Sequence, residues 1–358
     1  MNGLKSNKDR LWESLMLMAQ LGATSDGGVS RLALSEADRQ ARDLLAGWVQ
    51  ALGLEVLVDQ VGNMIAIRPG ELELPAVLLG SHLDTVSSGG RFDGAAGVLA
   101  GLEVLRTLEE NHVHTRHPIG LVVFTNEEGA RYTTDLMGSR AFNGMLTAEE
   151  VWSIRGTDGS LVGDELQRIG YKGQVKCGSI HPHAYLELHV EQGPHLESSG
   201  IPIGVVEAIT GITWLEVTVK GVANHAGTTP MNQRRDAGLA GARMAALLPE
   251  LADRIPGLRA TCGCFSLLPG MINVIAREAR FTVDLRHADL RRLAEAENIF
   301  TANIQEIARL LAVSVDTVTL GHVDPQTCDP GVVNLLEESC RALEYPYQRM
   351  VSGAGHDA

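Results

Sequence analysis

The first part of the chain alternates segments of helical periodicity with unbroken apolar runs. An amphipathic pattern over about 35–52 predicts a helix, and a second helix pattern begins just after Asp93. The predicted strands are the apolar runs at 64–68, 76–80, 119–125 and 185–190. Runs without polar alternation are typical of strands buried on both faces. This rhythm predicts an α/β fold: a catalytic domain with a mostly parallel central sheet.

The pattern changes after about residue 210. Residues 213–220 (TWLEVTVK) alternate strictly, as a half-exposed strand does. In GTTPM, Thr229 is predicted as the N-cap and Pro230 as the first residue of a helix that runs to about Ala252. The remaining elements predicted in this part are strands at 260–267, 279–286 and 313–320 and a helix at about 290–311.

These elements form two strand–helix–strand units, which predict a compact inserted α+β domain. The predicted division is therefore a discontinuous first domain at 1–209 and 326–358, interrupted by the inserted domain at 210–325. The chain of 358 residues is long enough for two cores.

Composition narrows the class of protein. A hydrophobic content of 44% with 21% charged residues excludes a mainly disordered chain. The net charge of -14 argues against a nucleic-acid surface, because phosphate binding requires clustered Lys and Arg. No apolar run approaches the ~20 residues of a membrane span, and the N-terminus lacks the apolar core of a secretory signal. We expect a cytoplasmic protein without a membrane partner.

Acidic and imidazole side chains follow the predicted strands. They are His82 and Asp93 in GSHLDTVSSGGRFDG, Glu127 and Glu128 in FTNEEGAR, and His189 in ELHVEQGP. Imidazoles and carboxylates hold zinc, manganese, cobalt or nickel in proteins. Open α/β sheets bind ligands beyond the carboxyl ends of their strands, so the sequence predicts a metal centre there.

Each of these residues also has a simpler interpretation. In His82-x-Asp84, the carboxylate of Asp84 is expected either to orient the imidazole by a hydrogen bond behind the metal or merely to cap the histidine at the strand end. Asp93 alone would be a helix N-cap, and His189 alone a buried structural histidine. Two adjacent glutamates are costly after an apolar strand unless a cation or a proton separates their roles. The combination favours the metal centre.

The inserted domain has its own polar set. His225 in GVANHAGTTP, Asn273 in MINV and Arg286 in VDLRHAD adjoin apolar strand positions. An arginine at a strand end suits a bidentate grip on a carboxylate. From spacing alone, a structural salt bridge of Arg286 to Asp284 or Asp289 is the favoured alternative.

With these motifs in view, the chain resembles the amidase (hydantoinase/carbamoylase) branch of the M20 metallopeptidase-like family. The resemblance extends from about Gly27 to Ala358 and rests on GSHLDTVSSGGRFDG, FTNEEGAR, ELHVEQGPHLE, NHAGTTPMNQRRDA and SGAGHDA. It implies a zinc-peptidase-like catalytic domain and an inserted lid domain that pairs two subunits into a homodimer.

The resemblance also implies roles for these residues. His82 and His189 would hold one of two divalent metal ions, Asp93 would bridge, and Glu128 would belong to the second ion. Glu127 would be the catalytic general base.

A small-molecule carboxylate substrate is implied as well. Gln192, His225, Asn273 and Arg286 would bind it. For the proton chemistry, Glu127 would take a proton from the attacking water and return it to the leaving nitrogen.

The implied reaction is hydrolysis of the carbamoyl C–N bond of an N-carbamoyl-L-amino acid to the amino acid, carbon dioxide and ammonia. Allantoate amidohydrolase and β-ureidopropionase are alternatives within the branch. Members of the branch supply a later histidine to the second metal, beyond SGAGHDA, and on that ground the second site is expected to lack this ligand. An alternative of another class is therefore an inactive fragment that retains metal or partner binding.

Overall fold

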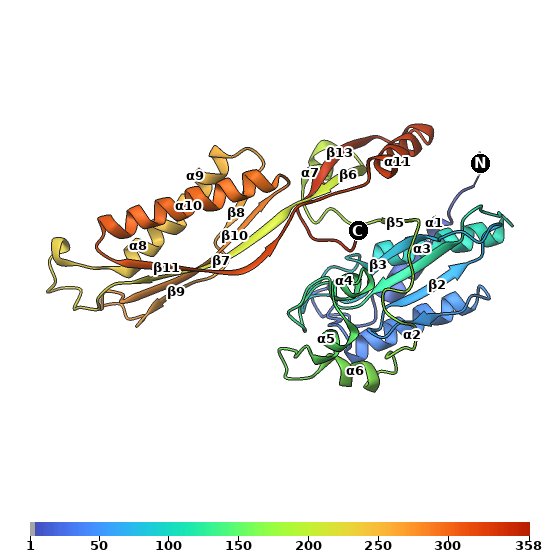
Figure 1. Ribbon diagram of the computed structural model, residues 1–358, viewed down its shortest axis with the longest axis horizontal. Coiled ribbons are helices and arrows are strands. Elements are labelled where there is room, and N and C mark those ends of the chain that lie inside the picture. The colour runs from blue at the N-terminus through green and yellow to red at the C-terminus, as the bar shows by residue number, and fades with distance from the viewer. Residues whose placement is uncertain (1–3) are drawn as a thin grey trace. The chain divides into compact units, whose positions relative to one another are not determined.

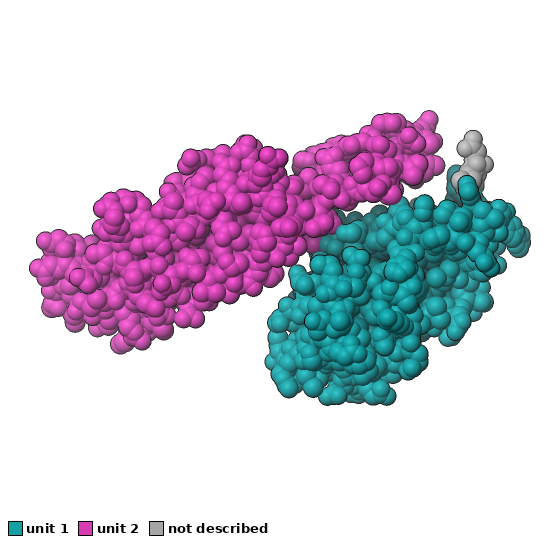
Figure 2. All heavy atoms as spheres, in the orientation of Figure 1, with its two compact units in different colours: residues 1–192, 356–358 teal, residues 193–355 magenta. Residues whose placement is uncertain are grey.

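The structure is a computed structural model that describes residues 4–358. The chain forms two compact units, residues 1–192 with 356–358 and residues 193–355, coloured separately in Figure 2. Residues 193–209 and 326–355, which we assigned from the sequence to the catalytic domain, cluster here with the second unit. The reason is continuity: strand β6 (Ile203–Ile209) leads directly into strand β7 (Gly211–Lys220). The domain limits 1–209, 210–325 and 326–358 stay predictions.

The first unit is an α/β fold with a five-stranded sheet in the order β1-β2-β4-β3-β5 (Figure 1). Its strands are β1 (Leu57–Val58), β2 (Met64–Arg68), β3 (Val77–His82), β4 (Ile119–Phe124) and β5 (Ala184–Glu187). Its helices are α1 (Lys8–Met18), α2 (Glu36–Gln50), α3 (Ala95–Glu110), α4 (Met137–Phe142), α5 (Ala148–Ser153) and α6 (Val162–Arg168). Helix α2 and strands β2, β3, β4 and β5 were predicted to within a few residues.

Strands β3, β4 and β5 run parallel, as expected, and β2 runs antiparallel to both of its neighbours. In the parallel register His82 pairs with Phe124, and Gly80 pairs with Glu187. The carboxyl ends of the three strands therefore meet at one edge of the sheet, and the segments that follow them begin side by side.

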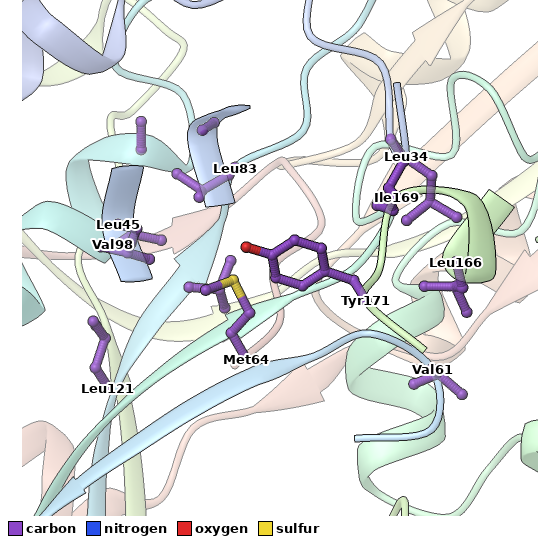
Figure 3. Packing of buried hydrophobic residues seen from close by; sticks show 14 of the residues in the cluster. Leu34, Leu45, Val61, Met64, Leu83, Val98, Leu121, Leu166, Ile169 and Tyr171 are labelled. Carbon is purple, nitrogen blue, oxygen red and sulfur yellow. The ribbon is translucent and has the colours of Figure 1, made fainter. Parts of the chain in front are cut away.

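The main core of the first unit lies between this sheet and its helices. Figure 3 shows its apolar side chains, among them Leu45 from α2, Met64 from β2 and Val98 from α3. Leu83 belongs to the same core and is 0% exposed. Because Leu83 follows β3 directly, its burial ties the segment beyond that strand to the hydrophobic core.

The second unit contains an antiparallel sheet in the order β11-β7-β10-β8, with β9 also pairing with β10. Its elements are α7 (His195–Ser199), β6, β7, a 3₁₀ turn (Met231–Gln233), α8 (Ala237–Ala245), α9 (Leu247–Arg254), β8 (Arg259–Thr261), β9 (Phe265–Leu268), β10 (Glu278–His287), α10 (Leu290–Leu310), β11 (Ser314–Val323), β12 (Gln326–Thr327), α11 (Pro330–Ala342) and β13 (Tyr347–Ser352). The buried positions of β7 alternate, and they share a core with α8 and α10. A smaller sheet, β12-β6-β13, packs with α11.

The predicted helix from Thr229 to Ala252 is wrong. The Thr229 hydroxyl donates to the carbonyl of His225, and helix α8 begins only after Asp236, whose side chain caps it. The helix then ends at Ala245 and restarts as α9. Pro249 explains the break, because it has no N–H to donate to the carbonyl four residues earlier.

The strand predicted at 260–267 is divided into β8 and β9. Thr261 pairs with Asp284 and Phe265 with Phe281, so the strand advances four residues while its partner advances three. The additional residue is accommodated as a bulge-like interruption between the two short strands, where Gly263 lies.

Among residues 4–358, no helix combines the length and the apolar content needed to cross a membrane.

Candidate metal centre

Three side chains converge beyond the carboxyl edge of the first sheet. His82 ends β3, His189 follows β5 by two residues, and Asp93 immediately precedes the Gly94 cap of α3. Asp93 Oδ1 lies 3.2 Å from His189 Nε2 and 4.0 Å from His82 Nε2. Their potential ligand atoms all lie within 4.8 Å of one another. The parallel register accounts for the meeting, because continuing the Gly80–Glu187 pairing by two residues brings His82 beside His189.

The adjacent glutamates reach the same place from β4. Glu127 Oε2 lies 3.4 Å from His82 Nε2, and His82, Glu127 and Glu128 form a second group of closely spaced ligand atoms. Asn126, which precedes them, has a positive φ of 56° and donates its side-chain amide to the carbonyls of Tyr132 and Thr134. These bonds fix the turn from which both glutamates project.

The imidazoles are oriented by main-chain carbonyls. His82 Nδ1 lies 2.9 Å from the carbonyl oxygen of Asp84, and His189 Nδ1 lies 2.9 Å from that of Val190. Because a carbonyl only accepts, each Nδ1 carries a proton, which leaves each Nε2 as the atom that would offer a lone pair to a bound metal ion. This is the tautomer that a metal-binding histidine needs.

Asp84 acts differently from the sequence-based expectation. Its carbonyl, not its carboxylate, contacts the His82 ring. The buried carboxylate instead accepts from the main-chain N–H groups of Glu127 at 3.2 Å and Glu128 at 3.3 Å. Strand β3 ends at His82, so the strand alternation that would place the two side chains on one face does not extend to Asp84. Asp84 therefore links the segment after β3 to the glutamate pair after β4.

Asp93 is not the helix N-cap that its position in the sequence suggested. Gly94 takes that position, and Asp93 Oδ2 accepts a 2.6 Å hydrogen bond from Gln192 Nε2. Burial acts against ionisation, but the hydrogen bond from His189 and the charge of His82 lower the pKa of Asp93. The carboxylate is thereby kept anionic between two imidazoles.

The remaining carboxyl groups of this cluster are buried close to one another, which disfavours their ionised forms. Burial, together with repulsion by Asp357, Asp84 and Glu128, raises the pKa of Glu127 to about 11. Burial likewise raises the pKa of Glu128, Asp84 and Glu187. Glu128 Oε1 is buried without a hydrogen-bond partner among the described residues. A bound cation removes both problems, because an adjacent positive charge favours the ionised form.

Sequence reasoning gave no role to Glu187, His356 and Asp357, which the structure places in this cluster. Glu187, His189 and His356 form a further group of ligand atoms within 4.8 Å, and the rings of His189 and His356 are 4.6 Å apart. Both carboxylate oxygens of Asp357 are buried, and the charge of this group raises the pKa of Glu127. The signals were the E-x-H spacing of Glu187, which ends β5, and His189, which follows it, and the H-D pair in SGAGHDA.

The predicted substrate-binding residues fall in different places. Gln192 lies in the first unit against Asp93. In the second unit, the segments of His225 and Asn273 are paired, since Ala226 N–H donates to the Asn273 carbonyl at 2.9 Å. Arg286 makes the ion pair with Asp284 at 2.8 Å that spacing favoured, and it also donates to the carbonyl of Gly353.

Comparison with known proteins places this arrangement in a family. Residues 78–358 match peptidase family M20/M25/M40. An N-carbamoyl-L-amino-acid amidohydrolase of Rhizobium meliloti is 41% identical over 98% of this chain and 85% of its own length. An allantoate amidohydrolase of Bacillus subtilis is 32% identical over 99% of this chain and 87% of its own.

Among solved structures, an amidase of the hydantoinase/carbamoylase family from Burkholderia multivorans superposes with a TM-score of 0.95. It is 42% identical and covers 99% of this chain and 87% of its own. The fold, the strand-end cluster and these similarities agree: the chain belongs to peptidase family M20/M25/M40 and, within it, to the hydantoinase/carbamoylase amidases.

Proposed function

We propose that this hydrolase of C–N bonds is a metal-dependent amidohydrolase that cleaves the carbamoyl C–N bond of N-carbamoyl-L-amino acids. The observation that supports it most is the convergence of His82, Asp93 and His189 beside the Glu127–Glu128 pair. Relatives named N-carbamoyl-L-amino-acid amidohydrolase are 35–41% identical to this chain. The products would be the amino acid and carbamic acid, which decomposes to carbon dioxide and ammonia.

The donor set fits divalent metal ions. Imidazole nitrogens and carboxylate oxygens suit zinc, manganese, cobalt or nickel. His82, His189 and Asp93 would hold one ion, and Glu128 together with Asp93 would hold a second. A divalent cation at this place would polarise the scissile carbonyl and lower the pKa of water.

Glu127 is the proposed general base. Its Oε2 lies 3.4 Å from His82 Nε2, so the carboxylate is adjacent to the proposed metal ligands. Since its pKa is raised to about 11 in the metal-free chain, Glu127 is protonated at neutral pH until a cation is present. With the cation bound, Glu127 takes a proton from the attacking water and returns it to the amino-acid nitrogen as the C–N bond breaks.

The substrate carboxylate is assigned to Arg286, with Asn273, His225 and Gln192 as further substrate-binding residues. The planar guanidinium of Arg286 suits a carboxylate, and its bond to Asp284 holds it in one orientation. His225 is exposed and accepts at Nδ1 from the N–H of Gly227, which leaves Nε2 for the developing oxyanion.

Allantoate amidohydrolase is the second candidate, since relatives with that name are 32–33% identical to this chain. The higher identity to carbamoylases favours the first candidate.

A substrate panel tests the proposal. Metal-loaded protein should release free amino acid from N-carbamoyl-L-amino acids faster than ammonia from allantoate. The Glu127→Gln variant, which keeps the shape of the side chain and removes the base, should lose about 10²–10⁴-fold in rate. Equal rates of amino-acid release by wild type and Glu127→Gln would refute the assignment, and faster turnover of allantoate would select the second candidate.

A further inference from the structure

A buried arginine lies behind the metal centre. Arg31 is 1% exposed, and among the described residues its guanidinium makes no ion pair. It donates instead to main-chain carbonyls: Nε to Leu83 at 2.6 Å, and Nη1 to Leu21 at 2.8 Å and Met18 at 3.1 Å. A buried cation bound only to carbonyls is costly, so it requires a compensating advantage.

The bond to Leu83 is the contact that reaches the site. Leu83 lies between His82 and Asp84, in the segment that leaves β3. The main chain of Arg31 holds the same segment at a second point: its N–H donates to Thr85 Oγ1, and its carbonyl accepts from the N–H of Thr85, both at 2.8 Å. Residues 83–85 are therefore fixed by both the backbone and the side chain of Arg31.

This segment determines the geometry of the centre. The Asp84 carbonyl orients the His82 ring, and the Asp84 carboxylate holds the N–H groups of Glu127 and Glu128. A displacement of Leu83 would move all of these groups, because they depend on the two residues that flank it.

The electrostatics agree with this geometry. Burial lowers the pKa of Arg31, and the charges of Asp38 and Asp84 oppose that effect. The positive charge of Arg31 therefore lies within the field of the carboxylate that holds the glutamate pair.

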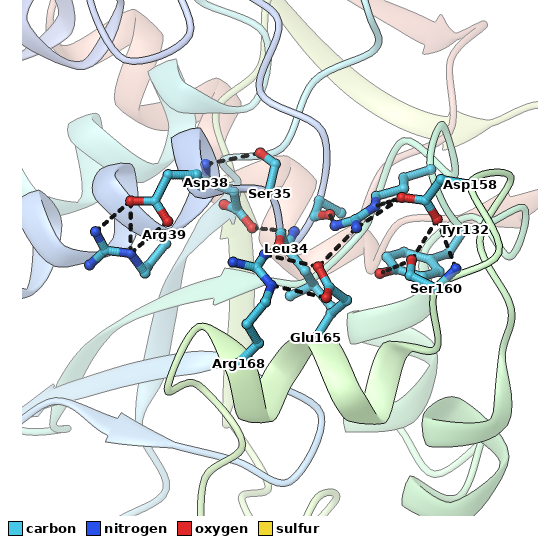
Figure 4. A network of polar contacts seen from close by, with 12 residues as sticks. Leu34, Ser35, Asp38, Arg39, Tyr132, Asp158, Ser160, Glu165 and Arg168 are labelled. Atoms are coloured by element: carbon cyan, nitrogen blue, oxygen red, sulfur yellow. Dashed lines mark hydrogen bonds and ion pairs between the residues drawn. The ribbon is translucent and has the colours of Figure 1, made fainter.

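The chain after Arg31 is rigidly held as well. Figure 4 shows Leu34 between Asp38, which accepts from its N–H at 2.8 Å, and Arg168, which donates to its carbonyl at 2.9 Å. Arg42 in turn pairs with Asp38 at 3.0 Å. The backbone of Arg31 is therefore anchored close to these bonds. Its guanidinium can in turn hold the carbonyl of Leu83, just beyond the end of β3, in one place.

We propose that Arg31 is a positioning residue of the metal centre, which holds the His82–Asp84 segment in its metal-binding geometry through the bond from its guanidinium to Leu83. This inference rests on the proposed function, because it presumes that the centre binds metal. Arg31 itself touches no proposed ligand.

The experiment measures zinc affinity of the metal-stripped chain by competition with a chromogenic chelator. Arg31→Met keeps the unbranched part of the side chain to about the position of Nε but leaves the carbonyls without their donor. Its dissociation constant for zinc should rise about 10–100-fold, as is usual when the support of a ligand is removed. The matched control is Arg68→Met: Arg68 is also buried, at 8% exposure, but its guanidinium pairs with Glu109 away from the centre. The control should keep wild-type affinity.

Wild-type zinc affinity in folded Arg31→Met would overturn the inference, and so would an equal loss in Arg68→Met. If Arg31→Met does not fold, Arg31→Lys decides: it keeps the charge but cannot bridge the three carbonyls, so weaker zinc binding is expected and unchanged binding contradicts us. Failure of the wild-type chain to bind zinc, manganese, cobalt or nickel would instead contradict the proposed function, which separates the two claims.

Discussion

At the residue scale, the centre depends on which atoms each side chain leaves available. His82 and His189 use Nδ1 on carbonyls, so that both Nε2 atoms face Asp93. Glu127 and Glu128 are neighbours of one chemical type with different surroundings, since Glu127 borders the His82 ring and Glu128 has a buried oxygen without a partner. These different surroundings support the different roles that we propose for the two glutamates.

Glu127 and Glu128 should therefore respond differently to the same substitution. We expect Glu127→Gln to lose hydrolysis while its zinc affinity stays within a few-fold of wild type. Glu128→Gln should weaken metal binding, because an amide supplies no negative charge to the ion. Metal counts by elemental analysis beside amino-acid release check both. Loss of metal from Glu127→Gln with retention in Glu128→Gln would reverse the assignment.

Metal binding should strengthen as the pH rises. Burial raises the pKa of Glu128. For His189, burial acts in the opposite sense, but the hydrogen bonds that it donates to Asp93 and to the Val190 carbonyl, together with the charges of Glu187 and Asp93, outweigh burial and raise its pKa. Both groups must lose protons to bind a cation, so protons compete with the metal up to a higher pH than for free side chains. Affinity should increase by about tenfold per pH unit for each proton displaced. Proton release on adding zinc, followed by an indicator dye, measures this; a pH-independent affinity would refute it.

At the element scale, helix α3 begins against the centre. Gly94 has φ +62°, and a Cβ built there would lie 2.5 Å from the His82 ring. A glycine is required on both counts, since other residues are strained at positive φ and any side chain would displace the imidazole.

Gly94→Ala should therefore lower the free energy of unfolding by about 1–3 kcal/mol and weaken zinc binding. The control is Gly47→Ala in α2, where nothing among the described residues lies within 4 Å of an added Cβ. That variant should be neutral or stabilised by up to about 1 kcal/mol, with unchanged zinc affinity. Thermal unfolding and chelator competition give both quantities. Normal zinc binding by Gly94→Ala would mean that the ring is free to move.

Whether an element could be predicted from the sequence depended on how local its determinants are. The parallel strands and the groups that follow them were found because apolar runs and strand ends are local features. The contacts of Asp84 were not, because they depend on the irregular segment that follows β3 and on main-chain groups after β4, which periodicity does not describe. The helix predicted from Thr229 failed through Pro249 and the stronger cap at Asp236. Arg31 carried no signal, since its partners are carbonyls distant in sequence.

At the scale of the whole molecule, the resemblance to the family implies a homodimer through the inserted domain. Edge strand β11 exposes Val318 at 57% and Leu320 at 55%, which suits a surface that another chain covers. Sedimentation velocity over a range of dilutions should give a dimer. A chain that is monomeric at every concentration would contradict this proposal and leave the metal centre unaffected.

The central claim is that the strand-end cluster performs hydrolysis by means of bound divalent metal. The most direct test is the rate of amino-acid release from an N-carbamoyl-L-amino acid by the metal-stripped chain as metal is returned. We predict no release without metal and a rate that rises with bound metal until the centre is filled. The same rate before and after metal is returned would contradict the account.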